Sequence, residues 1–439
     1  FIQADAASRH GLILVLGRTG KGVRRMRMAF NLLLMFATVG YGAAQAASTD
    51  SLSTAAYQED FDAAWTFIRD NYAYFDQKQT DWKRVRMLYL PKVAGLRSKR
   101  EFIGLLEDMV EELYDPHAHL GVNTASSPRL VPSGTDLWAE WQDERAVITA
   151  VRVGSEAEQA GLLRGMEIVS INGQPVRDIV RDRLPSALRA PDPAANDWAL
   201  RAALAGHHDS PVRVTVKSGD EMETFAFQPG STDRPEDLLT AKILAGNIGY
   251  VHVHNALEDT ALIAAWDSAL AALRDTGGLV IDLRDTPSGG DTTVARAILS
   301  RLISKEQPYQ RHEFSAEERR YGVKRIWVEY VAPRGPITYD RPVVALVGRW
   351  TGSMGEGLAI GLDGMQRATI IGTQMAGLRG AKGDTTLPHT GFKVSIPVER
   401  LYHIRGMPRE EFVPTLPAQS SESSTDPTFQ AALEYFKAR

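Results

Sequence analysis

The chain has 439 residues, of which 44% are hydrophobic, and it contains no cysteine. Because a single hydrophobic core rarely grows beyond roughly 250–300 residues, this length predicts two or three domains. The absence of cysteine excludes disulfide bridges, thiolate metal sites, a cysteine nucleophile and a lipidated cysteine. The formal net charge is −4 and no block of basic residues occurs, so nucleic acid is not expected as a partner.

The N-terminal part of the chain has the pattern of an export signal. Arginines within 24–27 precede a short apolar run at 29–39, and small residues follow up to an A-x-A site that ends at Ala46. This order is typical of a signal peptide, so we expect residues 1–46 to be a signal peptide with an upstream extension. The alternative is an uncleaved membrane anchor, for which the apolar run is short. The expected mature protein is periplasmic or secreted, without stable membrane insertion.

The next region, predicted over residues 49–125, has the pattern of a helical domain. Hydrophobic residues recur at intervals of three and four, first over Phe61–Ile68 and again over Phe102–Leu113. Proline is poorly tolerated inside a helix, so Pro116 is expected to lie beyond the end of the second helix. This places His117 on a loop.

The hydrophobic period changes over residues 128–230, which indicates a small β-rich domain. Alternation over 146–151 predicts a strand. The run 154–176 then predicts a short helix stopped by Gly161, a turn at Gly165 and a strand that ends in an Asn-Gly pair. This run resembles a PDZ domain, a module that binds an extended peptide along a sheet edge and holds its C-terminal carboxylate. The alternative is a PDZ domain that acts only as a lid or spacer.

Strands and helices alternate between residues 240 and 416. We expect strands at 248–253, 278–283, 343–347 and 369–371, and helices at 262–273, 293–303 and 355–362. This alternation is typical of βαβ units around a mostly parallel sheet. The expected fold class is therefore multidomain α/β, with a helical N-terminal region, a PDZ-like β-rich domain and an α/β core. Residues 417–439 are expected to form a linker and a C-terminal helix.

Two glycine-rich turns in the third region are suited to catalysis. The strand at 343–347 runs into Gly-Arg-Trp-Thr-Gly-Ser-Met-Gly, which places Ser353 at a strand-to-helix turn. The free N–H groups and the dipole of the helix N-terminus can stabilise an oxyanion there, so Ser353 is a candidate nucleophile; the alternative is a simple helix cap. Gly289 and Gly290 follow another buried strand, where glycine lets backbone N–H groups approach a ligand, or simply forms a tight turn.

Taken in order, these segments resemble the C-terminal-processing (tail-specific) serine peptidase family, including its tricorn-core-like branch. The resemblance covers nearly the whole expected mature chain and rests on the PDZ-like run together with these segments: Trp82, D-P-H at 115–117, D-L-R-x-x-x-x-G-G at 282–290, S-x-x-E at 353–356, T-Q-M-A-G-L at 373–378 and P-R-E-E-F-V-P at 408–414. The family implies a PDZ domain beside an α/β serine peptidase core, here 240–416. By this resemblance the core is expected to cleave peptides or unfolded proteins, possibly near their C-termini, and we expect it to need no metal or cofactor.

The resemblance implies a role for four kinds of residue around the serine. Ser353 is the nucleophile by its position three residues before Glu356. Glu356 orders the turn rather than reacting. The oxyanion hole is expected from the N–H of Met354 and a backbone N–H of Gly289 or Gly290.

The general base is the point at which this chain departs from the lysine-using branch. That branch has a lysine about 25 residues after the serine, where this chain has Leu378. Lys382 follows four residues later, on a segment expected to be flexible, and is the alternative base, which would require a shift of that loop. The tricorn-like branch instead uses the histidine of the D-x-H turn, here His117. Its ordinary pKa near 6.5 suits proton abstraction at neutral pH. A carboxylate from near the C-terminus, Glu410 or Glu411, is expected to steady the histidine.

Alternatives to a peptidase remain open from the sequence. A rival hypothesis is a catalytically inactive peptide- or small-ligand-binding protein on the same scaffold, because the lysine of the sister branch is missing. A hydrolase of small esters or amides is a third possibility. His117, His119 and Asp115 suggest a metal site, but no further ligand is spaced for zinc, so no metal is expected. The oligomeric state is not predicted.

Overall fold

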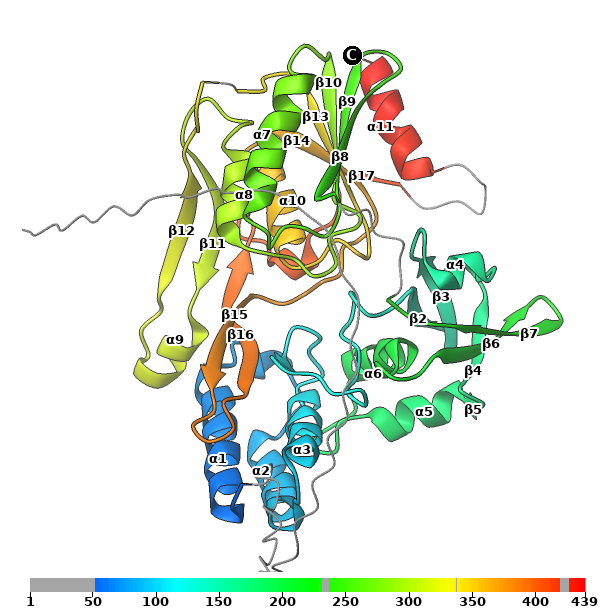
Figure 1. Cartoon of the computed structure of the whole chain (residues 1–439), viewed down its shortest axis with the longest axis vertical. Helices are drawn as coiled ribbons and strands as arrows, with labels where there is room; N and C mark the ends of the chain where they lie inside the picture. The colour runs from blue at the N-terminus through cyan, green and yellow to red at the C-terminus, as the bar shows by residue number, and fades with distance from the viewer. Residues whose placement is uncertain (1–51, 231–236, 337, 419–425, 439) are drawn as a thin grey trace, which may run out of the picture. The chain divides into compact units, whose positions relative to one another are not determined.

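The computed structural model describes residues 52–230, 237–336, 338–418 and 426–438, all within one unit spanning Ser48–Arg439 (Figure 1). The expected signal peptide at 1–46 lies outside the described residues. Among the described residues, no helix has both the length and the apolar character needed to span a membrane.

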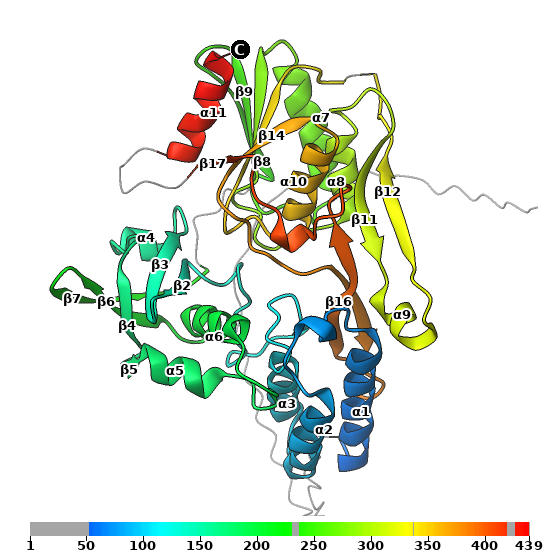
Figure 2. The same ribbon diagram turned by 180° about the vertical axis from the view of Figure 1, so that it is seen from behind.

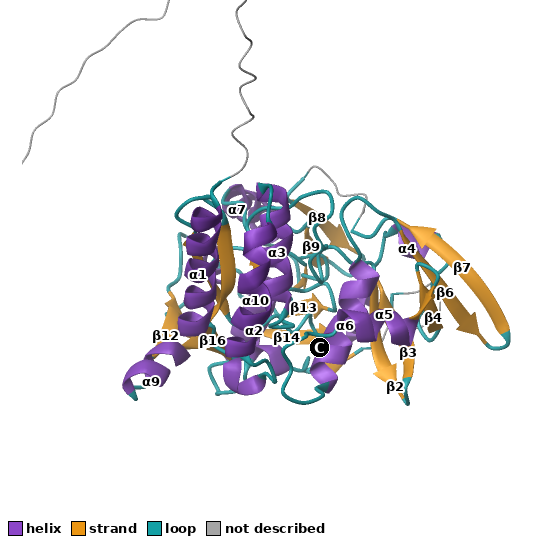
Figure 3. Cartoon of the chain, turned by 90° about the horizontal axis from the view of Figure 1, so that it is seen from below, coloured by secondary structure: helices purple, strands orange, loops and turns teal. Residues whose placement is uncertain are grey.

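Three helices form the N-terminal part of the described chain and lie side by side (Figure 3). They are α1 (Thr54–Asn71), α2 (Trp82–Tyr89) and α3 (Lys99–Glu111), joined by the short 3₁₀ helices η1 (Phe75–Gln77) and η2 (Leu90–Gly95). The apolar positions that recur at three and four residues are buried in one shared core, among them Phe61 and Phe102. The predicted helical character of this region is therefore confirmed.

The second part is an antiparallel sheet with three helices, as the PDZ-like pattern predicts. Its strands are β2 (Leu137–Gln142), β3 (Arg145–Val151), β4 (Glu167–Ile171), β5 (Gln174–Pro175), β6 (Val212–Ser218) and β7 (Glu221–Phe227), and its helices are α4 (Glu156–Gln159), α5 (Val176–Arg183) and α6 (Pro193–Ala205). The strand order is β2-β3-β4-β6-β7, with β5 paired to β4. Gly161 and Gly165 have φ of +99° and +92°, so both predicted turns use backbone that favours glycine.

The α/β core contains a six-stranded sheet in the order β17-β14-β13-β10-β9-β8. The strands are β8 (Leu239–Leu244), β9 (Ile248–Val253), β10 (Gly278–Asp282), β13 (Val343–Val347), β14 (Ala368–Gly372) and β17 (Leu416–Pro417). Only the pair β8–β9 is antiparallel among these neighbours. The mostly parallel core sheet predicted from the alternating pattern is confirmed.

Helices cover both faces of this sheet (Figure 2). Leu279 and Ile281 of β10 pack with α7 (Ala261–Leu273), α8 (Thr292–Leu299) and α10 (Met354–Gly364), whereas Val280 packs on the other face with α11 (Pro427–Lys437). This split follows from the alternation of side chains along a strand.

Helix α8 is shorter than the sequence predicts. It ends at Leu299 rather than at residue 303, and Ser300 follows as its C-cap. The Ser300 hydroxyl donates to the carbonyl of Ala297 at 2.8 Å. Such local side-chain bonds compete with continuation of a helix.

A second, antiparallel sheet was not among the predicted elements. It has the order β1-β16-β11-β12, with β15 paired to β16, and comprises β1 (His119–Leu120), β11 (Gln307–Glu313), β12 (Ile326–Val331), β15 (Ala381–Thr386) and β16 (Lys393–Tyr402); α9 (Ser315–Tyr321) lies between β11 and β12 in the chain. Strand β1 follows the turn that carries His117, and His119 pairs with Ser395 of β16. This sheet therefore brings the end of the helical region to the C-terminal part of the core.

Candidate active site

Ser353 stands at the turn between β13 and α10, directly before the first residue of the helix. Its backbone has φ +48° and ψ −105°, a left-handed conformation that is uncommon for a residue other than glycine. Such strained residues cluster at functional sites, where the surrounding structure holds them in place. The position agrees with the predicted strand-to-helix turn.

The two glycine-rich turns pack directly against each other. The amide of Gly352 donates to the carbonyl of Thr286 at 3.1 Å. A Cβ added at Gly289 would lie 2.4 Å from the Cβ of Ser353, and one added at Gly355 would lie 2.4 Å from Oγ1 of Thr286. Any larger side chain at either glycine would force the turns apart. The glycines are therefore explained by close contact of backbone around Ser353.

The structure distinguishes between the two glycines proposed for the oxyanion hole. The amide of Gly289 donates to the carbonyl of Thr286 at 3.1 Å, so this N–H is already used. The amides of Gly290 and Met354 have no backbone acceptor among the described residues outside the helix. Gly289 adjoins the amide nitrogen of Met354, which would be 3.0 Å from an added Cβ. The geometry thus favours the pair Gly290 and Met354 as donors, with Gly289 providing space.

Glu356 is fully buried and binds three backbone amides. Its Oε2 accepts from Ser353 at 2.8 Å and from Leu378 at 3.2 Å, and its Oε1 accepts from Gly377 at 2.9 Å. Burial raises the pKa of Glu356 to about 7. Because both oxygens are engaged with backbone, this residue holds the serine turn against residues 377–380, called here the connecting segment, as the resemblance implies.

His117 lies on a turn between α3 and β1 and is buried, as 5% of it is exposed. Its Nδ1 is 2.6 Å from the carbonyl oxygen of Arg379 in the connecting segment. A carbonyl oxygen can only accept, so Nδ1 carries the proton and Nε2 keeps the lone pair. A general base needs a lone pair on the nitrogen that takes the proton, and in this tautomer that nitrogen is Nε2.

The charges around His117 keep its ring neutral. Burial, followed by the positive charges of Lys382 and Arg409, lowers the pKa of His117 to about 3. The backbone is fixed by Asp115, whose Oδ1 accepts from the His117 amide at 3.0 Å and whose Oδ2 accepts from Tyr72 at 2.7 Å. Asp115 therefore orients the turn rather than the ring.

Among the described residues, the Ser353 hydroxyl has no hydrogen bond to His117. The two are connected through the connecting segment: Glu356 beside the serine accepts from Gly377 and Leu378, and the next residue, Arg379, accepts from His117. Ser353 and His117 are thus linked through one segment of the chain, without a direct hydrogen bond between them.

The two candidate carboxylates, Glu410 and Glu411, differ in burial although both belong to the 3₁₀ helix η3 (Arg409–Glu411). Glu411 is exposed, whereas Glu410 is half-buried. Burial raises the pKa of Glu410, and the charges of Arg409 and Arg379 partly offset this. Its Oε2 is buried without a hydrogen-bond partner among the described residues, as is the Tyr74 hydroxyl. Of the two, only Glu410 is near enough to Glu356 for its charge to raise the pKa of that residue.

The expectation that Lys382 lies on a flexible segment is wrong. Lys382 belongs to β15 and pairs with Pro397 of β16, next to a bulge at Ala381. Its Nζ is 3.0 Å from Nε2 of His119, whose Nδ1 contacts the carbonyl of Leu120 at 2.9 Å. Strand pairing orders the glycine-flanked run, and His119 holds the ammonium group.

Arg409 and the carbonyl of Arg379 were not singled out from the sequence as parts of the site. Arg409 is buried and donates to the carbonyls of Leu378 and Gly380 at 2.8 and 2.9 Å. It thereby binds carbonyls of the connecting segment, whereas Glu356 binds its amides. In the sequence, Arg409 is only an arginine beside two acids in the P-R-E-E run. That pattern does not indicate that its side chain is buried.

Comparison with family models identifies two parts of the chain. Residues 247–415 match the family model described as Peptidase family S41, and residues 53–111 match the one described as Tricorn protease C1 domain. The α/β core of the chain, residues 247–415, therefore belongs to the S41 serine peptidase family. As a member, it is a hydrolase. The S41 match includes Ser353, Glu356 and Glu410, whereas His117 lies between the two matched segments.

Relatives of this S41 peptidase include C-terminal-processing proteases at low identity. The carboxyl-terminal-processing protease of Synechocystis sp. is 24% identical over 438 residues, which cover 94% of each chain. The carboxy-terminal processing protease CtpB of Bacillus subtilis is 26% identical over 227 residues, which cover 50% of this chain and 44% of CtpB.

Solved structures show the same fold. The photosystem II D1 C-terminal processing protease has a TM-score of 0.54 and 20% identity, and the match covers 83% of this chain and 93% of that one. Mature CPAF has a TM-score of 0.57 and 15% identity, with 88% and 96% covered. The multidomain α/β class expected from the sequence is confirmed.

Proposed function

We propose that this S41 peptidase is an exported serine endopeptidase that uses Ser353 as nucleophile and His117 as general base. The observation that carries the proposal is the hydrogen bond from His117 Nδ1 to the Arg379 carbonyl. It leaves the lone pair on Nε2, the nitrogen that must take the serine proton. The expected substrates are peptides or unfolded proteins, cut near their C-termini, as the names of the relatives suggest.

The proposed reaction is acyl transfer to the serine. Ser353 Oγ attacks the scissile carbonyl while His117 Nε2 takes its proton. The N–H groups of Gly290 and Met354, at the N-terminus of α10, stabilise the oxyanion. His117 then gives the proton to the leaving amine, and water, activated by the same imidazole, hydrolyses the acyl-enzyme.

Leu378 supports assignment to the branch without the usual catalytic lysine. Its side chain is buried, with 4% exposed, in an apolar cluster with Trp350 and Ala376. A Cβ added at Gly352, next to Ser353, would lie 3.3 Å from Cδ1 of Leu378. A hydrocarbon group therefore occupies space beside the serine turn and offers no base there. The proposal leaves this role to His117.

The described arrangement is proposed to be a resting state. The Ser353 hydroxyl has no bond to His117 among the described residues, and the low pKa of His117 disfavours the imidazolium that catalysis needs. Closure of the site around a peptide would bring the two together. Glu410, whose Oε2 has no hydrogen-bond partner in the described part of the chain, is proposed to stabilise the imidazolium at that stage.

The missing serine–histidine bond is also what a binding protein without catalysis would have, and this is the second candidate. The test is incubation of the mature chain with an unfolded protein and with peptides, with cuts located by mass spectrometry. Ser353→Ala, which removes only one oxygen, is the matched control. Cleavage by the parent and none by Ser353→Ala supports the enzyme. Saturable peptide binding by both, with no cleavage by either, supports the binding protein.

A further inference from the structure

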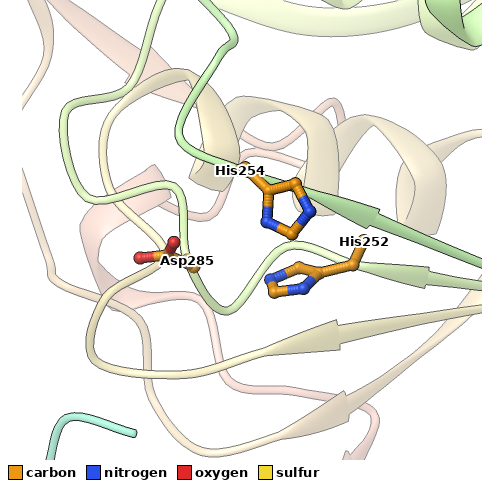
Figure 4. A group of neighbouring side chains, drawn as sticks. All are labelled: His252, His254 and Asp285. Atoms are coloured by element: carbon orange, nitrogen blue, oxygen red, sulfur yellow. The ribbon is translucent and has the colours of Figure 1, made fainter. Parts of the chain in front are cut away.

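A second H-x-H motif, far in the sequence from His117, lies at the end of β9. His252 and His254 flank Val253, and Asp285 approaches from the turn after β10 (Figure 4). One ligand atom from each of these three side chains lies within 4.8 Å of the others. The imidazole centroids are 4.3 Å apart. Residues two apart on a strand share a face, which explains why both rings are on the same side.

The ligand atoms that His252, His254 and Asp285 can offer face one another. Nε2 of His254 is 2.7 Å from the hydroxyl of Thr240, so Nδ1 is the nitrogen left free. Figure 4 shows one ring nitrogen of each histidine on the side that faces Asp285. Oδ1 of Asp285 accepts from Arg152 at 2.7 Å, which leaves Oδ2. Two imidazole nitrogens and one carboxylate oxygen thus converge.

We propose that His252, His254 and Asp285 bind a divalent transition-metal ion such as Zn²⁺. Zinc takes histidine nitrogen at about 2.0–2.1 Å and carboxylate oxygen at similar distance, and three protein ligands leave a fourth position for water. Tetrahedral geometry places ligand atoms about 3.4 Å apart, and the three atoms lie within 4.8 Å of one another, so they must approach by at most about 1.4 Å. All three are half-exposed, which allows this movement.

The surroundings contain groups that support the site and one that opposes it. Thr240 fixes the ring of His254, and Arg152 fixes the carboxylate of Asp285, as outer-shell partners of metal ligands commonly do. The positive charge of Arg152 opposes a cation. The metal must therefore be one that binds imidazole strongly, and Mg²⁺ is not expected to bind.

The proposed metal would join β9 to the turn that carries Gly289 and Gly290. The two segments are already bonded to each other. Asn255 Nδ2 donates to the Ser288 hydroxyl and the Ser288 amide donates to Asn255 Oδ1, both at 2.9 Å. A metal at this place would clamp the turn without contacting Ser353. The proposal does not depend on the peptidase mechanism, since it concerns binding alone.

The test is calorimetric titration of the untagged mature protein with ZnCl₂. We expect one saturable site per chain, at least tenfold weaker binding in His252→Ala/His254→Ala, and unchanged binding in His207→Ala/His208→Ala. The second pair removes the same number of histidines at exposed positions. Titration with MgCl₂ should give no saturable heat.

A second readout covers the carboxylate and protects against a folding defect. Co²⁺ should give visible absorption bands typical of nitrogen and oxygen ligation in the parent, and Asp285→Asn should lose them at the same concentration. The single variant His252→Gln, which keeps a polar side chain, replaces the double variant if that one fails to fold. Absence of saturable binding in the parent, equal loss in the 207/208 control, or parental binding in the variants of His252 and His254 or in Asp285→Asn would overturn the proposal.

Discussion

His117 and Glu356 hydrogen bond to consecutive residues of one segment. His117 Nδ1 donates to the carbonyl of Arg379 at 2.6 Å, while Glu356 accepts from the amides of Gly377 and Leu378. A shift of this segment would therefore move the proposed base and the serine turn together. The segment, rather than a direct contact, is what relates the two halves of the site at rest.

Gly289 is predicted to be required for activity because of its contact with Ser353. In Gly289→Ala, the new Cβ would lie 2.4 Å from the serine Cβ at a backbone φ of +71°. We expect at least about a 100-fold loss of kcat/KM, the size of effect seen when an oxyanion donor is displaced. The matched control is Gly391→Ala, with φ +74° and open space around it, which should keep parental activity. Similar losses in both would mean that the contact has no special role.

Glu410 and Glu411 should differ although they are neighbours. Glu410→Gln removes the half-buried charge proposed to stabilise the imidazolium and should lower kcat by about tenfold or more with little change in KM. Glu411→Gln alters an exposed side chain and should leave both constants within about twofold. Steady-state kinetics on one peptide decides between them, and the reverse order would show that the wrong carboxylate was assigned.

Stability should depend on pH with opposite signs for two buried groups. The pKa of His117 is about 3 when folded and 6.5 otherwise, so the unfolded state gains a proton first and stability falls by about 2 kcal/mol from pH 7 to pH 5. The pKa of Glu356 is raised to about 7 from 4.5, so the folded state gains a proton first and stability rises by about the same amount.

Urea unfolding at both pH values separates these contributions. His117→Gln should remove the decrease in the free energy of unfolding between pH 7 and pH 5. Glu356→Gln should remove the increase in the same quantity, so the two variants should deviate from the parent in opposite directions. Parental pH dependence in both variants would show that neither group is buried as described.

Processing of the N-terminus is predicted to occur after Ala46. The basic, apolar and A-x-A pattern in residues 24–46 carries this prediction. N-terminal sequencing of protein recovered from a host with a signal peptidase should give Ala47 as the first residue, in a periplasmic or secreted fraction. Replacing the A-x-A alanines Ala44 and Ala46 by bulky residues should block the cut. A retained N-terminus in the unaltered protein would support the membrane-anchor alternative.

Local patterns were sufficient for the parts of the fold built from neighbouring residues. The strand Val343–Val347 and the strand Ile248–Val253 coincide with the predicted ranges, because short apolar runs bounded by glycine are typical of buried parallel strands. The sheet of β1, β11, β12, β15 and β16 could not be predicted in this way. Strand β15 reads Ala-Lys-Gly-Asp-Thr-Thr, without hydrophobic alternation, and is ordered only by its partner β16.

The candidate site was predictable by residue type but not in its detail. The position of Ser353 follows from its turn, and His117 from the proline just before it. Which of two adjacent glutamates faces inward, and which amide of the Gly-Gly pair is free, depend on contacts across the fold. Lys382 shows the same limit, because its flanking glycines suggested flexibility while strand pairing and His119 hold it.

The most direct test of the proposed mechanism compares two substitutions of possible bases, His117→Ala and Lys382→Ala, by kcat/KM on the same peptide. The assignment of His117 predicts a loss of about 10²–10⁴-fold for His117→Ala and most of the activity retained in Lys382→Ala. An inactive Lys382→Ala together with an active His117→Ala would contradict it and assign a serine–lysine pair instead.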